Sequence, residues 1–134
     1  MKRTLSAAIV GIMLTVCGAV AAQAQDLKAM LLKPANGWVI EWFNPGSLDK
    51  GTTDVVFEER GGRVVAKLNI TNEGVYKAAN PICERDVAIT ADTIRFNGCR
   101  DADAVLIRDP NDKVYPLKTT SQTAMGYQWK LKEK

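Results

Sequence analysis

The feature of this sequence that most limits its fold is an alternation of apolar and polar residues with a period of two. After a short N-terminal stretch, nearly every run of five or six residues repeats this pattern and ends near Gly, Pro, Asn or Asp. Such runs are typical of short strands that bury one face, and they predict about eight strands in about 95 residues. The expected strands are residues 38–43, 54–58, 64–71, 87–90, 93–97, 104–108, 113–118 and 125–131.

The turns between these runs favour antiparallel neighbours. Gly61 and Gly62 supply the positive φ that a tight hairpin turn requires, while residues 72–86 predict a long irregular connection. Sequential antiparallel strands with one apolar face must close on themselves or pack against a second sheet. We therefore predict an all-β fold, a small antiparallel up-and-down β-barrel, with a β-sandwich of about eight strands as the alternative.

Two further elements fit the barrel. Closure would pair the strand of Trp38 with the strand of Trp129. A short N-terminal helical turn at Asp26–Leu32, with its apolar residues spaced for one face, would cover one open end.

The first 24 residues read as a signal peptide. A short basic region at Lys2 and Arg3 precedes an apolar stretch, and Ala22-Gln23-Ala24 supplies the small residues at which a signal peptidase cleaves. The apolar stretch is shorter than the roughly 20 residues that a membrane-spanning helix needs. We expect cleavage to leave residues 25–134 as a single exported β domain, in the periplasm or secreted by a bacterial Sec-type route, without a transmembrane segment.

Cys17 offers a second interpretation of the leader. The sequence Leu14-Thr15-Val16-Cys17 is similar to a bacterial lipobox, but Val16 stands where such boxes carry Gly, Ala or Ser. Cleavage after residue 24 is therefore favoured over lipidation of Cys17. The mature chain would have 16 basic and 15 acidic residues, a net charge of +1. This balance does not favour a nucleic-acid partner.

The mature chain keeps two cysteines, Cys83 and Cys99. An exported protein with two cysteines is expected to join them in one disulfide, which for this loop length contributes about 3 kcal/mol. A redox or metal site is not favoured, because the spacing is not C-x-x-C and no second pair of ligands is present.

The sequence gives no catalytic motif and no metal or cofactor site. It contains no histidine, which excludes a Ser-His-Asp triad, a Cys-His pair and any His-ligated metal. Ser47 and Lys50 match S-x-x-K, but they lie in a predicted loop without the partner motifs of penicillin-binding enzymes. The acidic pairs are expected to be solvated turns. We predict that the protein is not an enzyme.

The aromatic residues are better candidates for a binding site. Trp38, Trp42, Tyr127 and Trp129 fall on strands that would be neighbours in a closed barrel. They would either fill the core or line an apolar pocket for a lipid, pigment or other small hydrophobic ligand. Apolar residues at nominally outer positions indicate instead a patch for a protein partner: Val39, Phe43, Val56, Val65 and Leu106.

One resemblance concerns architecture alone. Gly37-Trp38 at the start of the first strand, with Lys or Arg near the closing strand, resembles the entrance of lipocalin-type (calycin) and avidin-type barrels. The lipocalin signature separates Gly from Trp by one residue, whereas here they are adjacent. The resemblance implies a ligand-binding barrel fold, and no binding residue is carried over from it.

Together these features predict a small exported, disulfide-stabilised β-barrel that acts as a non-enzymatic protein-binding module. The alternative is a carrier of a small hydrophobic ligand in a tryptophan-lined cavity. A protein-binding module would expose an apolar patch, whereas a carrier would enclose a cavity lined by Trp38, Trp42 and Trp129.

Overall fold

The structure, a computed structural model, describes residues 21–70, 82–99, 103–120, 123 and 125–134. In this part of the chain, eight antiparallel strands form one closed barrel in which each strand pairs with its neighbours in sequence. The last strand pairs with the first, so the prediction of an up-and-down barrel is confirmed and the sandwich is wrong. The strands are β1 (Trp38–Phe43), β2 (Lys50–Arg60), β3 (Arg63–Asn69), β4 (Ile82–Ile89), β5 (Thr93–Asn97), β6 (Asp103–Arg108), β7 (Leu117–Thr119) and β8 (Gln128–Glu133).

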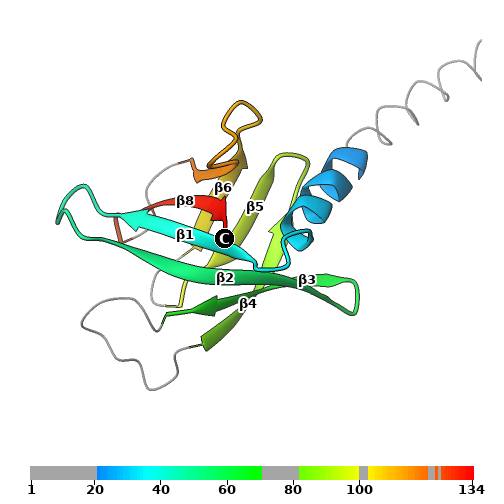
Figure 1. Ribbon diagram of the computed structural model, residues 1–134, viewed down its shortest axis with the longest axis horizontal. Coiled ribbons are helices and arrows are strands. Elements are labelled where there is room, and N and C mark those ends of the chain that lie inside the picture. Colours follow the sequence, from blue (N-terminus) through cyan, green and yellow to red (C-terminus); the bar gives the residue numbers. More distant parts are fainter. Residues whose placement is uncertain (1–20, 71–81, 100–102, 121–122, 124) are drawn as a thin grey trace, which may run out of the picture.

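A helix over residues 21–32 covers one end of the barrel (Figure 1). Leu27 and Leu31 project from one side of this helix and are fully buried against the strands. The helix ends before Gly37, whose φ is +77° and whose N–H donates to the carbonyl of Pro34. The predicted helical turn is thus confirmed as a cover, although the helix is longer than expected.

The interior is filled by every second side chain of each strand, because successive side chains in a strand point to opposite faces of the sheet. In β1, β2 and β3, the inward and outward positions alternate as predicted, and Gly61 and Gly62 form the β2–β3 turn at φ of +57° and +80°. The buried cluster consists of Leu27, Leu31, Trp38, Ile40, Val55, Phe57, Val64, Ala66, Leu68, Ile94, Phe96, Ala104, Leu106, Leu117, Trp129 and Leu131.

Two of the predicted outward residues are corrected by this arrangement. Leu106 faces inward and is fully buried, and its neighbour Ile107 is the exposed one. Val65 has outward parity but is also buried, so it does not contribute to an exposed patch. Phe43 and Val56 are exposed, as predicted, and Val39 is partly buried.

Some strand boundaries differ from the predicted ones. Strand β2 begins at Lys50 rather than Asp54, because a bond from Asn44 N–H to the Asp49 carbonyl already closes the hairpin. Strand β4 begins at Ile82 within the segment predicted to be irregular. Its residues Glu84, Arg85 and Asp86 carry polar side chains on both faces, and this removes the apolar signal.

The last two strands are also shifted. Strand β7 covers only Leu117–Thr119, because the carboxylate of Asp112 accepts bonds from the N–H groups of Val114 and Tyr115 and holds that segment in a turn. Strand β8 starts at Gln128, which leaves Tyr127 in the preceding loop. Residues 1–20, with the predicted basic region and Cys17, lie outside the described residues.

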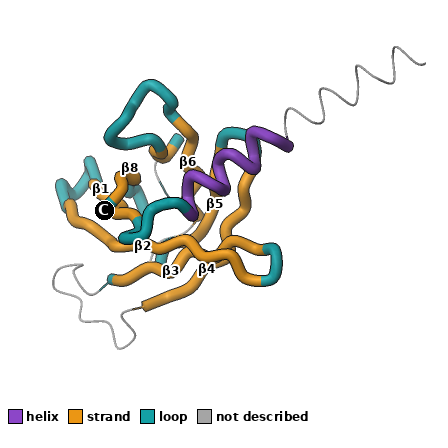
Figure 2. The backbone as a smooth tube through the Cα atoms, turned by 45° about the vertical axis from the view of Figure 1, so that its right-hand side comes forward, coloured by secondary structure: helices purple, strands orange, loops and turns teal. Residues whose placement is uncertain are grey.

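The two ends of the barrel differ (Figure 2). The end covered by the helix also carries the β2–β3, β4–β5 and β6–β7 connections. The opposite end, which we call the mouth, carries the β1–β2 loop (residues 44–49) and the β7–β8 loop, together with the end of β5 and the start of β4.

Candidate functional site

The four predicted aromatic residues divide between the core and the mouth. Trp38 lies at the end of the barrel that the helix covers and is 1% exposed. It donates its Nε1–H to the carbonyl of Leu31, 3.0 Å away. Trp129 is 6% exposed, with its ring centroid 5.6 Å from that of Phe96. Both therefore act as core residues, and their predicted role in ligand binding stays a prediction.

Trp42 and Tyr127 come together at the mouth. Their rings meet edge to face, with centroids 5.4 Å apart and an interplanar angle of 88°. Gly51, the cross-strand partner of Trp42, makes room for the indole: a Cβ there would lie only 2.8 Å from Cε2 and 2.9 Å from Cη2 of Trp42. The ring is thus fixed between β2 and the β7–β8 loop.

One atom of Trp42 is left without a partner. Its Nε1 is buried, and no acceptor among the described residues takes its hydrogen bond. Buried donors in folded proteins nearly always have an acceptor, so this N–H is an anomaly.

The β1–β2 loop beside this ring is ordered by the side chain of Asn44. Its carboxamide oxygen accepts from the N–H of Gly46 at 2.9 Å and of Ser47 at 3.3 Å, and its amide donates to the carbonyl of Met125 at 3.1 Å. Asn44 therefore joins the two loops of the mouth into one unit. The Leu48 N–H donates to the Asn44 carbonyl at 2.8 Å and closes the turn.

This loop presents an apolar side chain in an unfavourable conformation. Leu48 has a φ of +62°, which among the described residues makes it the sole residue other than glycine with a positive φ, and it is 71% exposed. A residue with a Cβ disfavours this region. Such strain persists where surrounding bonds enforce it, and it is concentrated at functional sites.

Other exposed apolar residues are also at the mouth. Of the seven large apolar residues that are exposed in the described part of the chain, four lie at this end: Phe43, Leu48, Ile82 and Met125. Leu48 and Met125 lie in the two loops that Asn44 joins, and Phe43 is the last residue of β1, directly before Asn44. We call these three residues the rim. The turn signal Asn44-Pro45-Gly46 locates the loop in the sequence, but nothing there marks Leu48 or Met125.

The disulfide lies at the same end. Cys83 near the start of β4 is bonded to Cys99 just after β5, with Cα atoms 5.9 Å apart, as predicted. It joins two strands with a short ladder, because in β4 only Ala88 and Ile89 pair with β5. Near the disulfide, the carbonyl of Glu84 accepts a bond from the Arg85 side chain at 3.0 Å.

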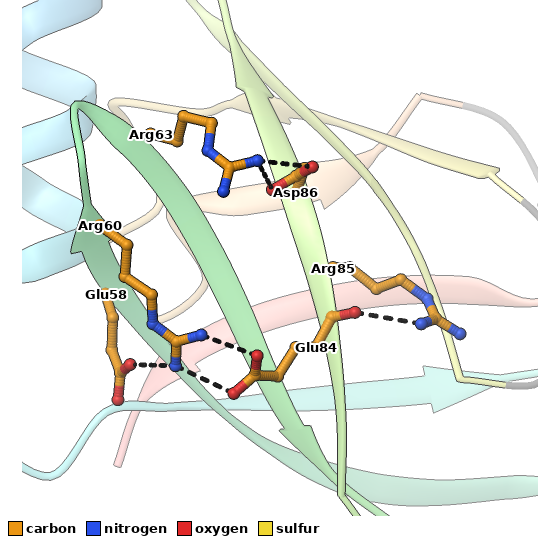
Figure 3. A network of polar contacts seen from close by, with 6 residues as sticks. All are labelled: Glu58, Arg60, Arg63, Glu84, Arg85 and Asp86. Carbon is orange, nitrogen blue, oxygen red and sulfur yellow. Dashed lines mark hydrogen bonds and ion pairs between the residues drawn. The ribbon is translucent and has the colours of Figure 1, made fainter.

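The acidic groups on the outer wall are engaged by cations (Figure 3). Arg60 lies between Glu58 and Glu84 and donates to each at 2.7 Å. These bonds hold the pKa of the Glu84 carboxyl below its ordinary value. Arg63 faces Asp86 across the β3–β4 pair. Among the described residues, no group of acidic and cysteine side chains could hold a metal ion.

A cleft of about 440 Å³ opens outside the barrel, between the helix and the β3–β4 wall. None of the four predicted ligand-binding aromatic residues lines it, and its charged residues are engaged in ion pairs: Lys28 with Glu59 and Arg63 with Asp86. The mouth is therefore the better candidate site.

Comparison with known proteins found no match among protein-family models, curated proteins or solved structures. The likeness to lipocalin-type and avidin-type barrels thus stays an expectation from sequence. Within the described ranges, no helix has the length and apolar character needed to cross a membrane.

Proposed function

We propose that the protein is a non-enzymatic protein-binding module, exported to the periplasm or secreted, and that the rim at the mouth is its docking surface. The observation that carries this proposal is Leu48, which is held at a φ of +62° and is 71% exposed. Folding keeps an apolar side chain in this position against both its backbone preference and the hydrophobic effect. A binding role accounts for that cost.

The geometry of the rim supports the same role. The hydrogen bonds of Asn44 fix both loops before any partner arrives. A preformed surface loses less conformational freedom on association, so more of the interaction energy is available for affinity. The disulfide beside the mouth adds rigidity, and it agrees with an oxidising compartment outside the cytoplasm.

The non-enzymatic part of the proposal has separate support. The sequence contains no histidine, and the carboxylates on the outer wall that face one another are bound to arginine or lysine side chains. These ion pairs lower the pKa of the Glu84 and Asp112 carboxyls, whereas a general acid needs a raised pKa.

The alternative function is carriage of a small hydrophobic ligand. It is favoured by the contact between Trp42 and Tyr127 at the mouth, where a ligand would enter. Trp38 and Trp129 do not favour it, because they pack within the buried cluster.

Native mass spectrometry of the mature protein, purified from its own exported fraction, tests the choice. We expect a stoichiometric protein partner that is lost from the double variant Leu48→Ser, Met125→Ser. Val114→Ser is the matched control, because Val114 is equally apolar and 59% exposed but lies in the β6–β7 connection at the other end. A partner that survives the double variant would place docking elsewhere, and a retained small molecule would favour the carrier.

A further inference from the structure

The sulfur-containing side chains differ in what an oxidant outside the cytoplasm can reach. Cys83 and Cys99 are joined in the disulfide, so neither of them offers a thiol. The methionines of the described residues are Met30 and Met125. A thioether is oxidised by direct contact with the oxidant, so the exposure of these two side chains decides where oxidation begins.

The two methionines lie in opposite environments. Met30 belongs to the helix, where it is partly buried and packs against the hydrophobic core. Met125 lies in the β7–β8 loop and is 56% exposed, with its side chain at the rim. A peroxide in the solvent therefore meets the thioether of Met125 first.

The backbone around Met125 is held by bonds that do not involve its thioether. Its carbonyl accepts from the side-chain amide of Asn44 at 3.1 Å. On either side of it, the N–H of Thr123 donates to the Tyr127 carbonyl and the N–H of Gly126 donates to the Thr123 carbonyl, each at 2.8 Å. A chemical change confined to the sulfur leaves these bonds in place, so it alters the surface of the rim and not its backbone.

Oxidation of this thioether changes the polarity of the rim. The sulfur takes one oxygen atom from hydrogen peroxide: the O–O bond breaks, an S–O bond forms, the sulfur is oxidised by two electrons and water leaves. The product, methionine sulfoxide, is polar, whereas the thioether is apolar. The side chains of Phe43 and Leu48 have no donor for the new oxygen. A partner that covers the rim with apolar groups would bury this oxygen without a hydrogen bond, which is unfavourable.

We propose that Met125 is the oxidation-sensitive residue of the rim, and that its conversion to the sulfoxide by a peroxide weakens docking of the protein partner. The effect on docking rests on the proposed function, whereas the site of oxidation is tested without a partner. Because a methionine sulfoxide can be reduced again by enzymes, the modification is a reversible control of docking.

Peptide mapping by mass spectrometry tests the site of oxidation. The folded mature protein is treated with limiting hydrogen peroxide, and the sulfoxide fractions at Met30 and Met125 are followed over time. We expect Met125 to be oxidised several-fold faster than Met30, and the two rates to become equal in urea, where both side chains are exposed. Equal rates in the folded protein, or faster oxidation of Met30, would overturn the proposal.

Native mass spectrometry tests the effect on docking. The free protein is oxidised, cleared of peroxide and mixed with untreated partner recovered from the exported fraction. We expect the affinity to fall about tenfold, with the melting temperature of the free protein unchanged. In Met125→Leu, peroxide should no longer change the affinity, whereas the control Met30→Leu should keep the full effect. A peroxide effect that persists in Met125→Leu, or a lower melting temperature after oxidation, would contradict the proposal.

The outcomes keep the two proposals apart. If oxidation of Met125 leaves the affinity unchanged while the double variant Leu48→Ser, Met125→Ser loses the partner, the oxidation proposal is wrong and the rim stands. If the untreated protein retains no partner, or the double variant keeps it, the proposed docking surface is wrong. In that case the rates at Met30 and Met125 still decide the site of oxidation.

Discussion

At the scale of single residues, the mouth depends on a few positions with distinct conformational demands. Asn44 is suited to its place because one amide side chain can accept from two N–H groups and donate to a carbonyl in another loop. Gly51 has to lack a Cβ because the indole of Trp42 occupies that space. Leu48 is the exception, since its conformation suits asparagine or glycine better. Its identity therefore points to a demand other than stability.

The substitution Leu48→Asn tests that interpretation. Asparagine adopts a φ near +60° more readily, and the 71% exposed leucine side chain buries little surface. We expect the free energy of unfolding to rise by about 0.5–1 kcal/mol while partner binding weakens. Urea denaturation measures the first effect. Leu48→Ser, which removes the side chain without favouring this conformation, is the control and should leave stability nearly unchanged.

At the scale of elements, the disulfide compensates for incomplete pairing between β4 and β5. Beyond Ala88 and Ile89 the two strands have no ladder, and the bond between Cys83 and Cys99 joins their other ends. We expect the double variant Cys83→Ala, Cys99→Ala to lose about 3 kcal/mol of stability, by the loop-length relation for a 16-residue separation. Chemical denaturation measures this loss.

The position of the damage is a further outcome of the same variant. Amide hydrogen exchange should accelerate at Cys83–Asp86 more than at Val64–Leu68 in β3, which is paired on both sides. Uniform acceleration along both strands would show that the disulfide acts on the whole barrel and not on this weak pair.

The strands that could be predicted from sequence are those that bury one apolar face. The alternation in Val64–Leu68 and the Gly61-Gly62 turn predicted β3 and its hairpin, and the series of antiparallel strands with one apolar face predicted that β1 and β8 pair. The start of β4 could not be predicted, because Glu84, Arg85 and Asp86 are polar on both faces and pairing with β3 supplies the order. Leu106 was assigned to the wrong face because five residues between turns leave the parity of a strand undetermined.

The candidate site was predictable in part for a similar reason. Aromatic residues on strands expected to be neighbours in a closed barrel indicated Trp42 and Tyr127, which the structure brings together. Phe43 was predicted to face outward, whereas Leu48 and Met125 gave no signal. The positive φ of Leu48 lies in a turn that Asn44 closes, and Met125 is held by a bond from Asn44 across 81 positions in the chain. Single-sequence patterns do not contain contacts of this range.

The helix of residues 21–32 has a structural role that a substitution can measure. Leu31 is 1% exposed, and its carbonyl accepts the Nε1–H of Trp38. We expect Leu31→Ala to destabilise the protein by about 2–5 kcal/mol, the usual cost of a cavity at a fully buried leucine. Denaturation followed by tryptophan fluorescence measures it, with the exposed Lys33→Ala as the control. A loss under about 1 kcal/mol, well below the lower end of this range, would mean that the helix is not part of the core.

At the scale of the whole molecule, ion pairs reinforce the closure of the barrel from outside. Lys132 of β8 binds Glu41 of β1 at 2.8 Å, and Tyr115 from the β6–β7 connection donates to the same carboxylate at 2.6 Å. Lys118 binds Asp112 at 2.6 Å in that connection. The pKa of Glu41 is lowered by the bonds from Lys132 and Tyr115, and Lys118 with the Tyr115 N–H lowers the pKa of Asp112 to about 2.

These shifts, with the absence of histidine, fix the pH dependence of stability. A carboxyl whose folded pKa is depressed stabilises the protein above its unfolded pKa, and this contribution is lost as the pH falls through the folded value. For Asp112, the loss runs from about pH 4 to about pH 2. Without histidine, no side chain with an ordinary pKa titrates between pH 5 and 8. We therefore expect the melting temperature to be flat from pH 5 to 8 and to fall in acid. The fall should be shallower in Asp112→Asn, which removes a carboxyl with a lowered pKa. A step in melting temperature near pH 6.5 would contradict this account, because it would require a titrating group that the sequence does not contain.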